Sequence, residues 1–106
     1  MLSELDRHIA DEFKEKLKNR VKLVNMKIYG SRARGDFSDD SDLDVFIEVD
    51  QITPKLRKLI SEIAWEVGFK RDRIISTFVA TPEQIEEGPL GAHPIIYQIE
   101  REGISI

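Results

Sequence analysis

The sequence predicts an α/β (α+β) fold in which a small mixed β-sheet is flanked by helices. Helix-type and strand-type hydrophobic patterns alternate along the chain in the order helix, strand, turn, strand, helix, strand, helix. Two Thr-Pro pairs, at residues 53–54 and 81–82, indicate helix starts, because threonine caps a helix and proline is favoured at its first position. At 106 residues the chain is expected to form a single domain, residues 1–106, with a modest core.

Ser3 is expected to cap the first helix. Apolar residues follow it at steps of four and would form the buried face of this helix: Leu5, Ile9, Phe13 and Leu17. Residues 21–29 then predict the first strand, which Gly30 ends. Residues 31–34 predict a single helical turn, and the N–H groups at the start of such a turn can bind an anion.

Residues 42–49 predict the second strand, after a polar loop at residues 35–41. Alternate residues of this strand are apolar and would face the core: Leu43, Val45, Ile47 and Val49. Because successive strand residues point to opposite faces, Asp42 and Asp44 would share the other face and converge on one spot. Two carboxylates beside the small-residue turn Gly30-Ser31 predict a site for Mg²⁺ and a nucleotide.

The second half of the chain predicts two helices around a third strand, and then a last helix. The first of these helices would begin at Thr53-Pro54 and close at Gly68. The third strand is expected from about Arg71 to Ala80, and a capping box at residues 81–84 opens the short helix after it. Residues 94–102 predict the last helix.

Composition and charge exclude several classes of function. The formal charge of −4 and the pI near 5.2 argue against broad binding to nucleic acid phosphates. Residues 30–50 hold seven acidic residues against two arginines, a concentration of charge that favours a bound cation. The chain has no cysteine, which excludes disulfides, thiolate metal sites and a cysteine nucleophile. No apolar run has membrane-spanning length and the N-terminus has no signal pattern, so we expect a cytoplasmic protein.

A composite motif joins the predicted turn to the second strand. It reads Gly30-Ser31, then Arg32-Ala33-Arg34-Gly35, then Ser41-Asp42-Leu43-Asp44-Val45. This pattern resembles the signature of the DNA polymerase β-like nucleotidyltransferase superfamily, in particular its minimal, single-domain nucleotidyltransferases. The motif combines several fixed positions over about a fifth of the chain, which makes the match specific.

The resemblance implies a Mg²⁺-dependent enzyme that transfers a nucleoside monophosphate, with AMP from ATP as the first candidate, to a hydroxyl. It implies that Asp42 and Asp44 are catalytic and hold two Mg²⁺ ions, and that Gly30 and Ser31 bind the nucleotide.

Arg32 and Arg34 are candidates for balancing the charge of the triphosphate. Only one of them can face inward on a single helical turn. For each arginine the alternative is an ion pair at the surface with Asp36 or Asp40.

A domain this small has little room for an acceptor site, and the resemblance implies a partner. Minimal nucleotidyltransferases are typically paired with a small helical HEPN protein, often as antitoxin to its RNase toxin, and a tyrosine of that protein can be the acceptor.

The alternative function is a catalytically weak module that binds nucleotide or masks its partner. Trp65 and the isoleucine-rich last helix are candidate interface elements, and a homo-oligomer stays open.

The sequence departs from the family at the third carboxylate, which the family places on the following strand. One face of the predicted third strand carries Asp72, Ile74, Ser76 and Phe78. We expect the family's acidic position to fall at Ile74 or Ser76, so either Asp72 stands in for it or only two carboxylates remain.

Other phosphate and metal motifs do not fit this segment. Gly30 and Gly35 have the spacing of P-loop glycines, but Asp36-Phe37 follows where Lys-Ser/Thr is required. An EF-hand loop starting at Asp40 would have Val45 at the obligatory glycine.

Overall fold

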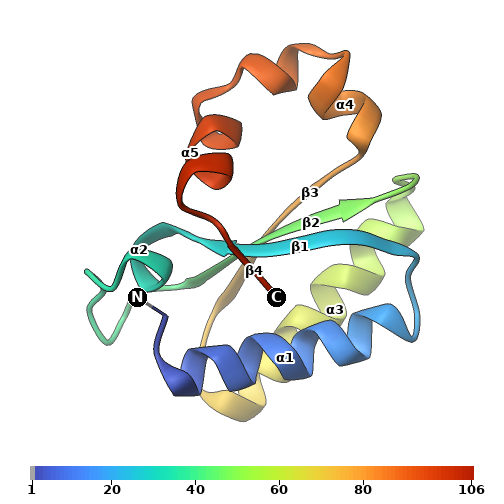
Figure 1. The fold of residues 1–106 in the computed structure, drawn as a ribbon. Helices are drawn as coiled ribbons and strands as arrows, with labels where there is room; N and C mark the ends of the chain where they lie inside the picture. Colours follow the sequence, from blue (N-terminus) through green and yellow to red (C-terminus); the bar gives the residue numbers. More distant parts are fainter. Residues whose placement is uncertain (1) are drawn as a thin grey trace.

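A computed structural model describes residues 2–106 and contains one mixed β-sheet with helices on both of its faces (Figure 1). The elements in chain order are α1 (Glu4–Lys18), β1 (Leu23–Tyr29), α2 (Gly30–Arg34), β2 (Leu43–Val49), α3 (Pro54–Arg71), β3 (Ile75–Ala80), α4 (Pro82–Glu86), the 3₁₀ helix η1 (Pro89–Ala92), α5 (Pro94–Glu102) and β4 (Ile104–Ser105). The strand order is β3-β2-β1-β4, in which β2 and β3 are parallel and β1 is antiparallel to both β2 and β4. The predicted fold class is confirmed.

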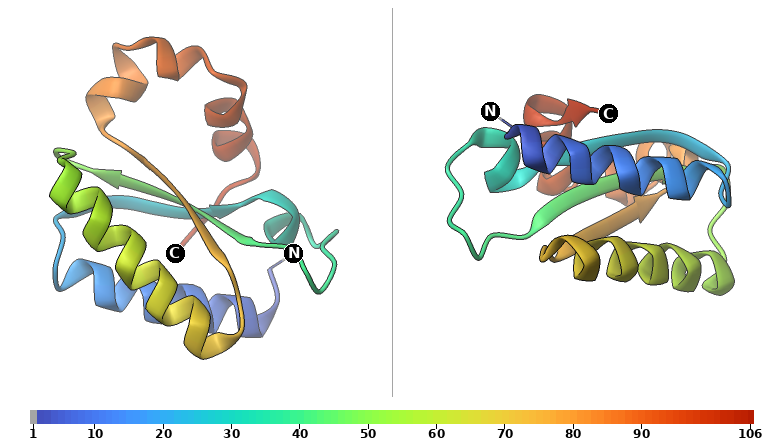
Figure 2. Two further views of the ribbon diagram at one scale, coloured as in Figure 1. Left: turned by 180° about the vertical axis from the view of Figure 1, so that it is seen from behind. Right: turned by 90° about the horizontal axis from the view of Figure 1, so that it is seen from below.

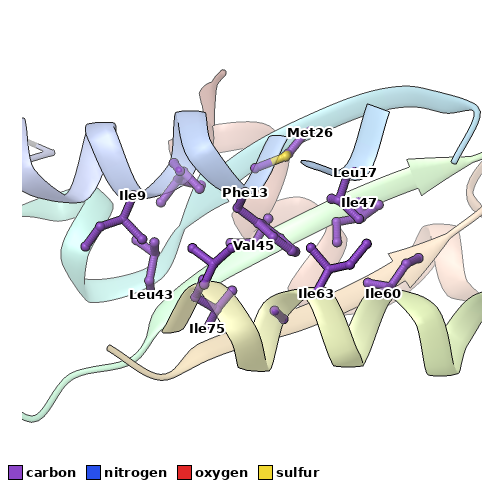
Figure 3. Close-up of a cluster of buried hydrophobic side chains, with 14 of the residues drawn as sticks. Ile9, Phe13, Leu17, Met26, Leu43, Val45, Ile47, Ile60, Ile63 and Ile75 are labelled. Carbon is purple, nitrogen blue, oxygen red and sulfur yellow. The ribbon is translucent and has the colours of Figure 1, made fainter. Parts of the chain in front are cut away.

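The main core lies between the sheet and the pair of long helices, α1 and α3, which cover one face together (Figure 2). Figure 3 shows how residues of α1, β2 and α3 interdigitate there: Ile9, Phe13, Leu17, Leu43, Val45, Ile47, Ile60 and Ile63. The alternation predicted for β2 is confirmed, because Leu43, Val45, Ile47 and Val49 are all buried on this face.

A second, smaller cluster covers the opposite face under α5. It consists of Tyr29, Phe46, Ala80, Ile96 and Ile99. The ring of Phe46 meets the ring of Phe78 edge-on at 6.0 Å. The central strand β2 is therefore buried on both faces along much of its length, whereas the sequence pattern indicated burial on one face only.

The buried face of α1 differs from the prediction at its start. Leu5 is 50% exposed, while Leu2 and Asp6 are buried. Strict steps of four drift around a helix of 3.6 residues per turn, so Leu5 has left the face that Ile9 and Phe13 share. The expected cap is confirmed, since the side chain of Ser3 accepts a hydrogen bond from the N–H of Asp6 at 3.0 Å.

The end of α3 is a second correction. The helix passes Gly68 and ends at Arg71, where Asp72 adopts a left-handed conformation with φ of 55°. Gly68 is needed because the returning chain crosses the helix there: a Cβ at this position would lie 2.3 Å from the carbonyl oxygen of Arg73. β3 consequently begins at Ile75 and not at Arg71.

The remaining boundaries agree closely with the sequence. The last helix has the predicted bounds, and the Thr81–Gln84 capping box is present at the start of α4. β4 was not predicted; it pairs with β1 through Lys27–Ser105 and Ile28–Ile104. Among residues 2–106, no helix combines the length and the apolar character needed to cross a membrane.

Candidate active site

The turn after β1 and the strand β2 meet at Gly30 and Asp44. The antiparallel register sets Tyr29 opposite Asp44, so the next residue, Gly30, lies directly against that carboxylate. Gly30 has φ of 78°, and a Cβ there would lie 2.3 Å from Oδ2 of Asp44. Glycine is required here both by the backbone conformation and by the approach of the carboxylate. The structure thus brings the predicted glycine-serine corner and one predicted aspartate together.

Asp42 and Asp44 are half-buried at the start of β2, and their charges interact. Burial raises the pKa of Asp44, the negative charge of Asp42 raises it further, and the positive charge of Arg34 opposes both. No ion pair to either carboxylate is present within residues 2–106. Two neighbouring carboxylates without an ion-pair partner are hard oxygen donors of the kind that a divalent metal ion binds.

Ser31 lies in the first turn of the five-residue helix α2, next to Gly30. Its carbonyl oxygen accepts hydrogen bonds from the N–H groups of Gly35 at 2.9 Å and Asp36 at 3.1 Å, which closes the turn. The N-cap residue Tyr29 provides no side-chain acceptor for the first N–H groups of this turn. The hydroxyl of Ser31 and these N–H groups are the polar groups that the corner offers to a phosphate.

Arg32 does not face the corner, which contradicts the expected nucleotide contact. Its side chain is 1% exposed, and Nη1 donates to Oδ2 of Asp6 at 3.0 Å. Its Nε donates to the carbonyl oxygen of Ser41 at 2.7 Å, and Nη2 donates to the carbonyl oxygens of Ser38 and Asp39, both at 3.3 Å. All three nitrogens of the guanidinium therefore donate hydrogen bonds within the protein.

Asp6 is the residue that the sequence reasoning missed. It is fully buried, and its second oxygen accepts a hydrogen bond from Nε of Arg73 at 3.1 Å. The available signal was its position: Asp6 lies one turn before Ile9 on the buried face of α1, where an acid needs a cationic partner.

The network around Arg32 holds the loop that leads into β2. The guanidinium also lies 4.5 Å from the centroid of the Phe37 ring. Since Ser41 is held by Nε of Arg32 and is followed directly by Asp42, this arginine fixes the backbone that carries the first aspartate. Its role is to position the motif.

Arg34 stays close to the aspartates but is shared with two other acids. Its Nε bonds to Asp36 at 3.1 Å and its Nη1 bonds to Glu102 of α5 at 3.0 Å. The surface pair with Asp36 that the sequence left open is present. Because its positive charge lowers the pKa of Asp44, Arg34 is the arginine of the motif that lies near the site.

The β3 residue beside Asp44 is a serine and not an acid. The parallel register of β2 and β3 pairs Asp44 with Ser76. Asp72 caps the end of α3, outside β3, so it does not take the stand-in role. Across residues 2–106, no three His, Cys, Asp or Glu side chains gather as a metal-type cluster. Of the two alternatives, the structure supports two carboxylates.

A hollow of about 510 Å³ opens on the side of the sheet that carries Asp44. Tyr29, Phe78, Gln84, Leu90 and Ile95 contribute to its lining. Burial and the charge of Asp44 raise the pKa of Tyr29 to about 12, so its hydroxyl stays protonated at neutral pH. The hollow therefore adjoins Asp44 through Tyr29, an aromatic residue that is neutral at that pH.

One family model and two curated relatives match the sequence of this chain. The family model for the nucleotidyltransferase domain matches residues 9–106. A protein of Methanocaldococcus jannaschii named as a proposed protein adenylyltransferase, MJ0141, is 36% identical over 74 residues, which are 67% of this chain and 75% of that protein. A second protein of the same organism and description, MJ1379, is 30% identical over 93 residues, which are 81% of this chain and 92% of its own.

Solved structures share the fold at low identity. A proposed minimal nucleotidyltransferase has a TM-score of 0.64 and 20% identity, covering 100% of this chain and 97% of its own. A toxin-antitoxin crystal structure with AMP-PNP has a TM-score of 0.63 and 17% identity, covering 90% of this chain and 69% of that chain. The corner, the aspartates and these relatives lead to one assignment: the chain belongs to the nucleotidyltransferase domain family, within the DNA polymerase β-like superfamily, and is a nucleotidyltransferase.

Proposed function

We propose that this protein transfers AMP from Mg²⁺-ATP to a hydroxyl group of a protein acceptor. The observation that carries the proposal is the contact between Gly30 and the carboxylate of Asp44, with the charge of Asp42 beside it. This arrangement unites a corner that can bind phosphate with oxygen ligands for a divalent cation. The choice of AMP and of a protein acceptor is supported by the two archaeal relatives, which are named as proposed protein adenylyltransferases.

Asp42 and Asp44 would hold the metal ions. They fit Mg²⁺ because they are hard oxygen donors, are half-buried, repel each other and have no cationic partner among the described residues. With Ser76 in the third position, triphosphate oxygens and water would complete the coordination. When bound, Mg²⁺ supplies charge neutralisation for the attacking and leaving oxygens.

The remaining residues of the corner would bind the triphosphate. The hydroxyl of Ser31 and the first N–H groups of α2 would donate to phosphate oxygens, while Gly30 keeps Asp44 within reach of them. Arg34 would exchange Asp36 or Glu102 for a phosphate, because its side chain is 39% exposed and already lies near Asp44. The hollow beside Tyr29 is of a size that suits a small ligand and would take the base.

In the proposed reaction the acceptor hydroxyl attacks the α-phosphorus in line with the departing pyrophosphate. A bond forms between the hydroxyl oxygen and phosphorus, and the bond from phosphorus to the bridging oxygen breaks. Pyrophosphate leaves with that electron pair, and the hydroxyl proton passes to solvent.

For the acceptor we propose a tyrosine of a small helical partner of the HEPN type, with this protein as the antitoxin. Support comes from solved toxin-antitoxin structures, one of them a mutant of MntA-HpeT with a TM-score of 0.61 and 17% identity, whose fold this chain shares. The second candidate function is a module that binds nucleotide or masks its partner with little turnover. Ser76 in the place of a third carboxylate is the observation that favours it.

A labelling experiment distinguishes the two candidate functions. The protein is incubated with ATP labelled at the α-phosphate, Mg²⁺ and the product of the neighbouring gene. Label on the neighbour that is lost in Asp42→Asn and kept in Asp50→Asn, an exposed acid after β2, supports the enzyme. A tight complex without label supports the module.

The metal assignment has its own test. Mg²⁺-ATP should raise the melting temperature of the parent, because a ligand that binds only the folded state stabilises it. The double variant Asp42→Asn/Asp44→Asn should show no such rise. Equal shifts in both proteins would contradict the assignment of Asp42 and Asp44 as metal ligands.

A further inference from the structure

A groove of about 680 Å³ lies away from the corner, between α3 and β3. One wall is a stripe along α3 that includes Trp65 and Phe69, and the other runs from Ile74 into the start of β3. Residues 39–41 of the motif loop close one end. Figure 2 shows α3 and the outer strand β3 side by side in the view from behind.

Large apolar side chains of the groove are exposed to solvent. Trp65 is 67% exposed, Phe69 is 76% exposed and Ile74 is 69% exposed. The rings of Trp65 and Phe69 stack with centroids 5.1 Å apart and planes 13° from parallel. A contiguous exposed cluster of this kind, in contrast to single exposed apolar residues, marks a contact surface.

The strand beside these rings is an open edge of the sheet. β3 stands at the end of the strand order and pairs only with β2 within the described residues. One side of β3 therefore presents backbone N–H and C=O groups to an incoming extended segment, which would extend the sheet.

Charge indicates the chemistry of that segment. Asp39, Asp40 and Asp72 line the groove, and none of them forms an ion pair within residues 2–106. The one cation in the lining, Arg73, donates to the buried Asp6 and to the carbonyl oxygen of Asp72. A complementary partner therefore carries lysine or arginine. A second copy of the chain would bring the same three acids to the same surface, so like charges would oppose self-association.

We infer that this groove binds an extended segment of a partner protein that carries both apolar and basic residues. The apolar residues cover Trp65, Phe69 and Ile74, and the basic residues pair with Asp39, Asp40 and Asp72. This surface is separate from the nucleotide site, although Ser41 at its end directly precedes Asp42. A bound partner would thus lie beside the loop that carries the first aspartate.

Trp65 is the only tryptophan of the chain, so its fluorescence reports on the groove directly. The full chain, without nucleotide, is titrated with a short synthetic peptide that has valine, isoleucine and phenylalanine at its centre and lysines at both ends. A second peptide has the same centre and glutamates at both ends. We expect the basic peptide to shift Trp65 emission to the blue at low salt, and the acidic peptide to bind about tenfold or more weakly.

Variants test whether the change in Trp65 fluorescence comes from peptide bound in the groove. The triple variant Asp39→Asn/Asp40→Asn/Asp72→Asn should bind the basic peptide about tenfold more weakly than the parent does. Phe69→Ser should remove most of the binding. The matched controls are Asp11→Asn and Val24→Ser, which remove an exposed acid and an exposed apolar residue elsewhere and should bind the peptide as the parent does. Because no nucleotide is present, failure here leaves the proposed function intact, and loss of Mg²⁺-ATP binding in Asp42→Asn leaves this inference intact.

Three results would overturn the inference. The first is no fluorescence change with either peptide, and the second is equal or tighter binding of the acidic peptide. The third is a dimer in analytical ultracentrifugation that Phe69→Ser dissociates, which would make the groove a contact between copies of this chain.

Discussion

Asp6 and Arg32 form an ion pair of 3.0 Å in which neither side chain reaches solvent, although the two residues are 26 positions apart in the chain. This pair joins α1 to the helical turn of the motif. Through the hydrogen bond from Arg32 to the carbonyl oxygen of Ser41, it also reaches the residue before Asp42. The helix α1 therefore helps to hold the backbone that leads into Asp42.

Removing one partner of this pair should be costly. Asp6→Asn would leave the buried guanidinium of Arg32 without its counter-charge, and we expect a loss of about 3–5 kcal/mol in the free energy of unfolding. Urea denaturation at neutral pH measures this loss. The exposed acid on the same helix, Asp11→Asn, should change stability by less than about 0.5 kcal/mol. Similar losses in the two variants would show that the buried pair has no special role.

The corner should not tolerate a methyl group at Gly30. Gly30→Ala and Gly35→Ala both force alanine into a positive φ, 78° and 88° respectively, at a cost of about 1 kcal/mol. Only the first variant drives a Cβ into the carboxylate of Asp44; at Gly35 no such collision is present among the described residues. Gly30→Ala should therefore lose more stability and also lose the rise in melting temperature with Mg²⁺-ATP. Retention of that rise in Gly30→Ala would refute the geometry of the corner.

A third carboxylate can be introduced at Ser76. Ser76→Asp sets an acid beside Asp44 in the parallel register of β2 and β3. Without metal the added negative charge should lower the melting temperature, because like charges repel. With Mn²⁺ or Mg²⁺ the variant should gain more stability than the parent does. Ser76→Asn is the uncharged control, and a metal response no larger than that control would be evidence against the assignment of Ser76 to the third position.

Tyr29 should ionise only at high pH. Its pKa is raised to about 12, first by burial and then by the charge of Asp44. The chain has two tyrosines, so in Tyr97→Phe the absorbance of phenolate reports Tyr29 alone. We expect a midpoint near 12, and a lower midpoint after Asp44→Asn. A midpoint near 10, the usual value for tyrosine, would contradict the buried position of the ring.

The same shift has a consequence for stability in alkali. The folded state holds the Tyr29 proton more tightly than the unfolded state, whose tyrosine ionises near pH 10. The free energy of unfolding should therefore fall as pH rises from about 10 to 12, and Tyr29→Phe should lack this part of the fall. Chemical denaturation at several pH values measures the difference.

Features that depend on neighbouring residues were predictable from the sequence. The alternation in β2, the caps at Thr53 and Thr81 and the bounds of α5 all follow from local patterns, and the structure has them. The glycine-serine corner and the two aspartates were found in the same way, because their spacing along the chain encodes a strand-turn-strand arrangement.

Features set by distant contacts were not predictable. From its place in the motif Arg32 was a candidate for contact with the triphosphate, and only the packing of α1 brings Asp6 to it. Glycine is typical of helix ends, so the sequence indicated that the helix closes at Gly68. Glycine is needed there for another reason, because the chain at Arg73 crosses the helix at that point. β4 is two residues long and exists because the edge of β1 is available to it.

The burial of β2 on both faces determines which part of the site can move. β2 is also hydrogen-bonded along both edges, to β1 and to β3, so its amides should exchange with solvent only when the whole domain unfolds. Asp44 stands on this strand, so we expect it to keep its place when a nucleotide binds. We therefore expect any movement around a bound nucleotide to involve α5, whose Glu102 accepts a hydrogen bond from Arg34 at 3.0 Å.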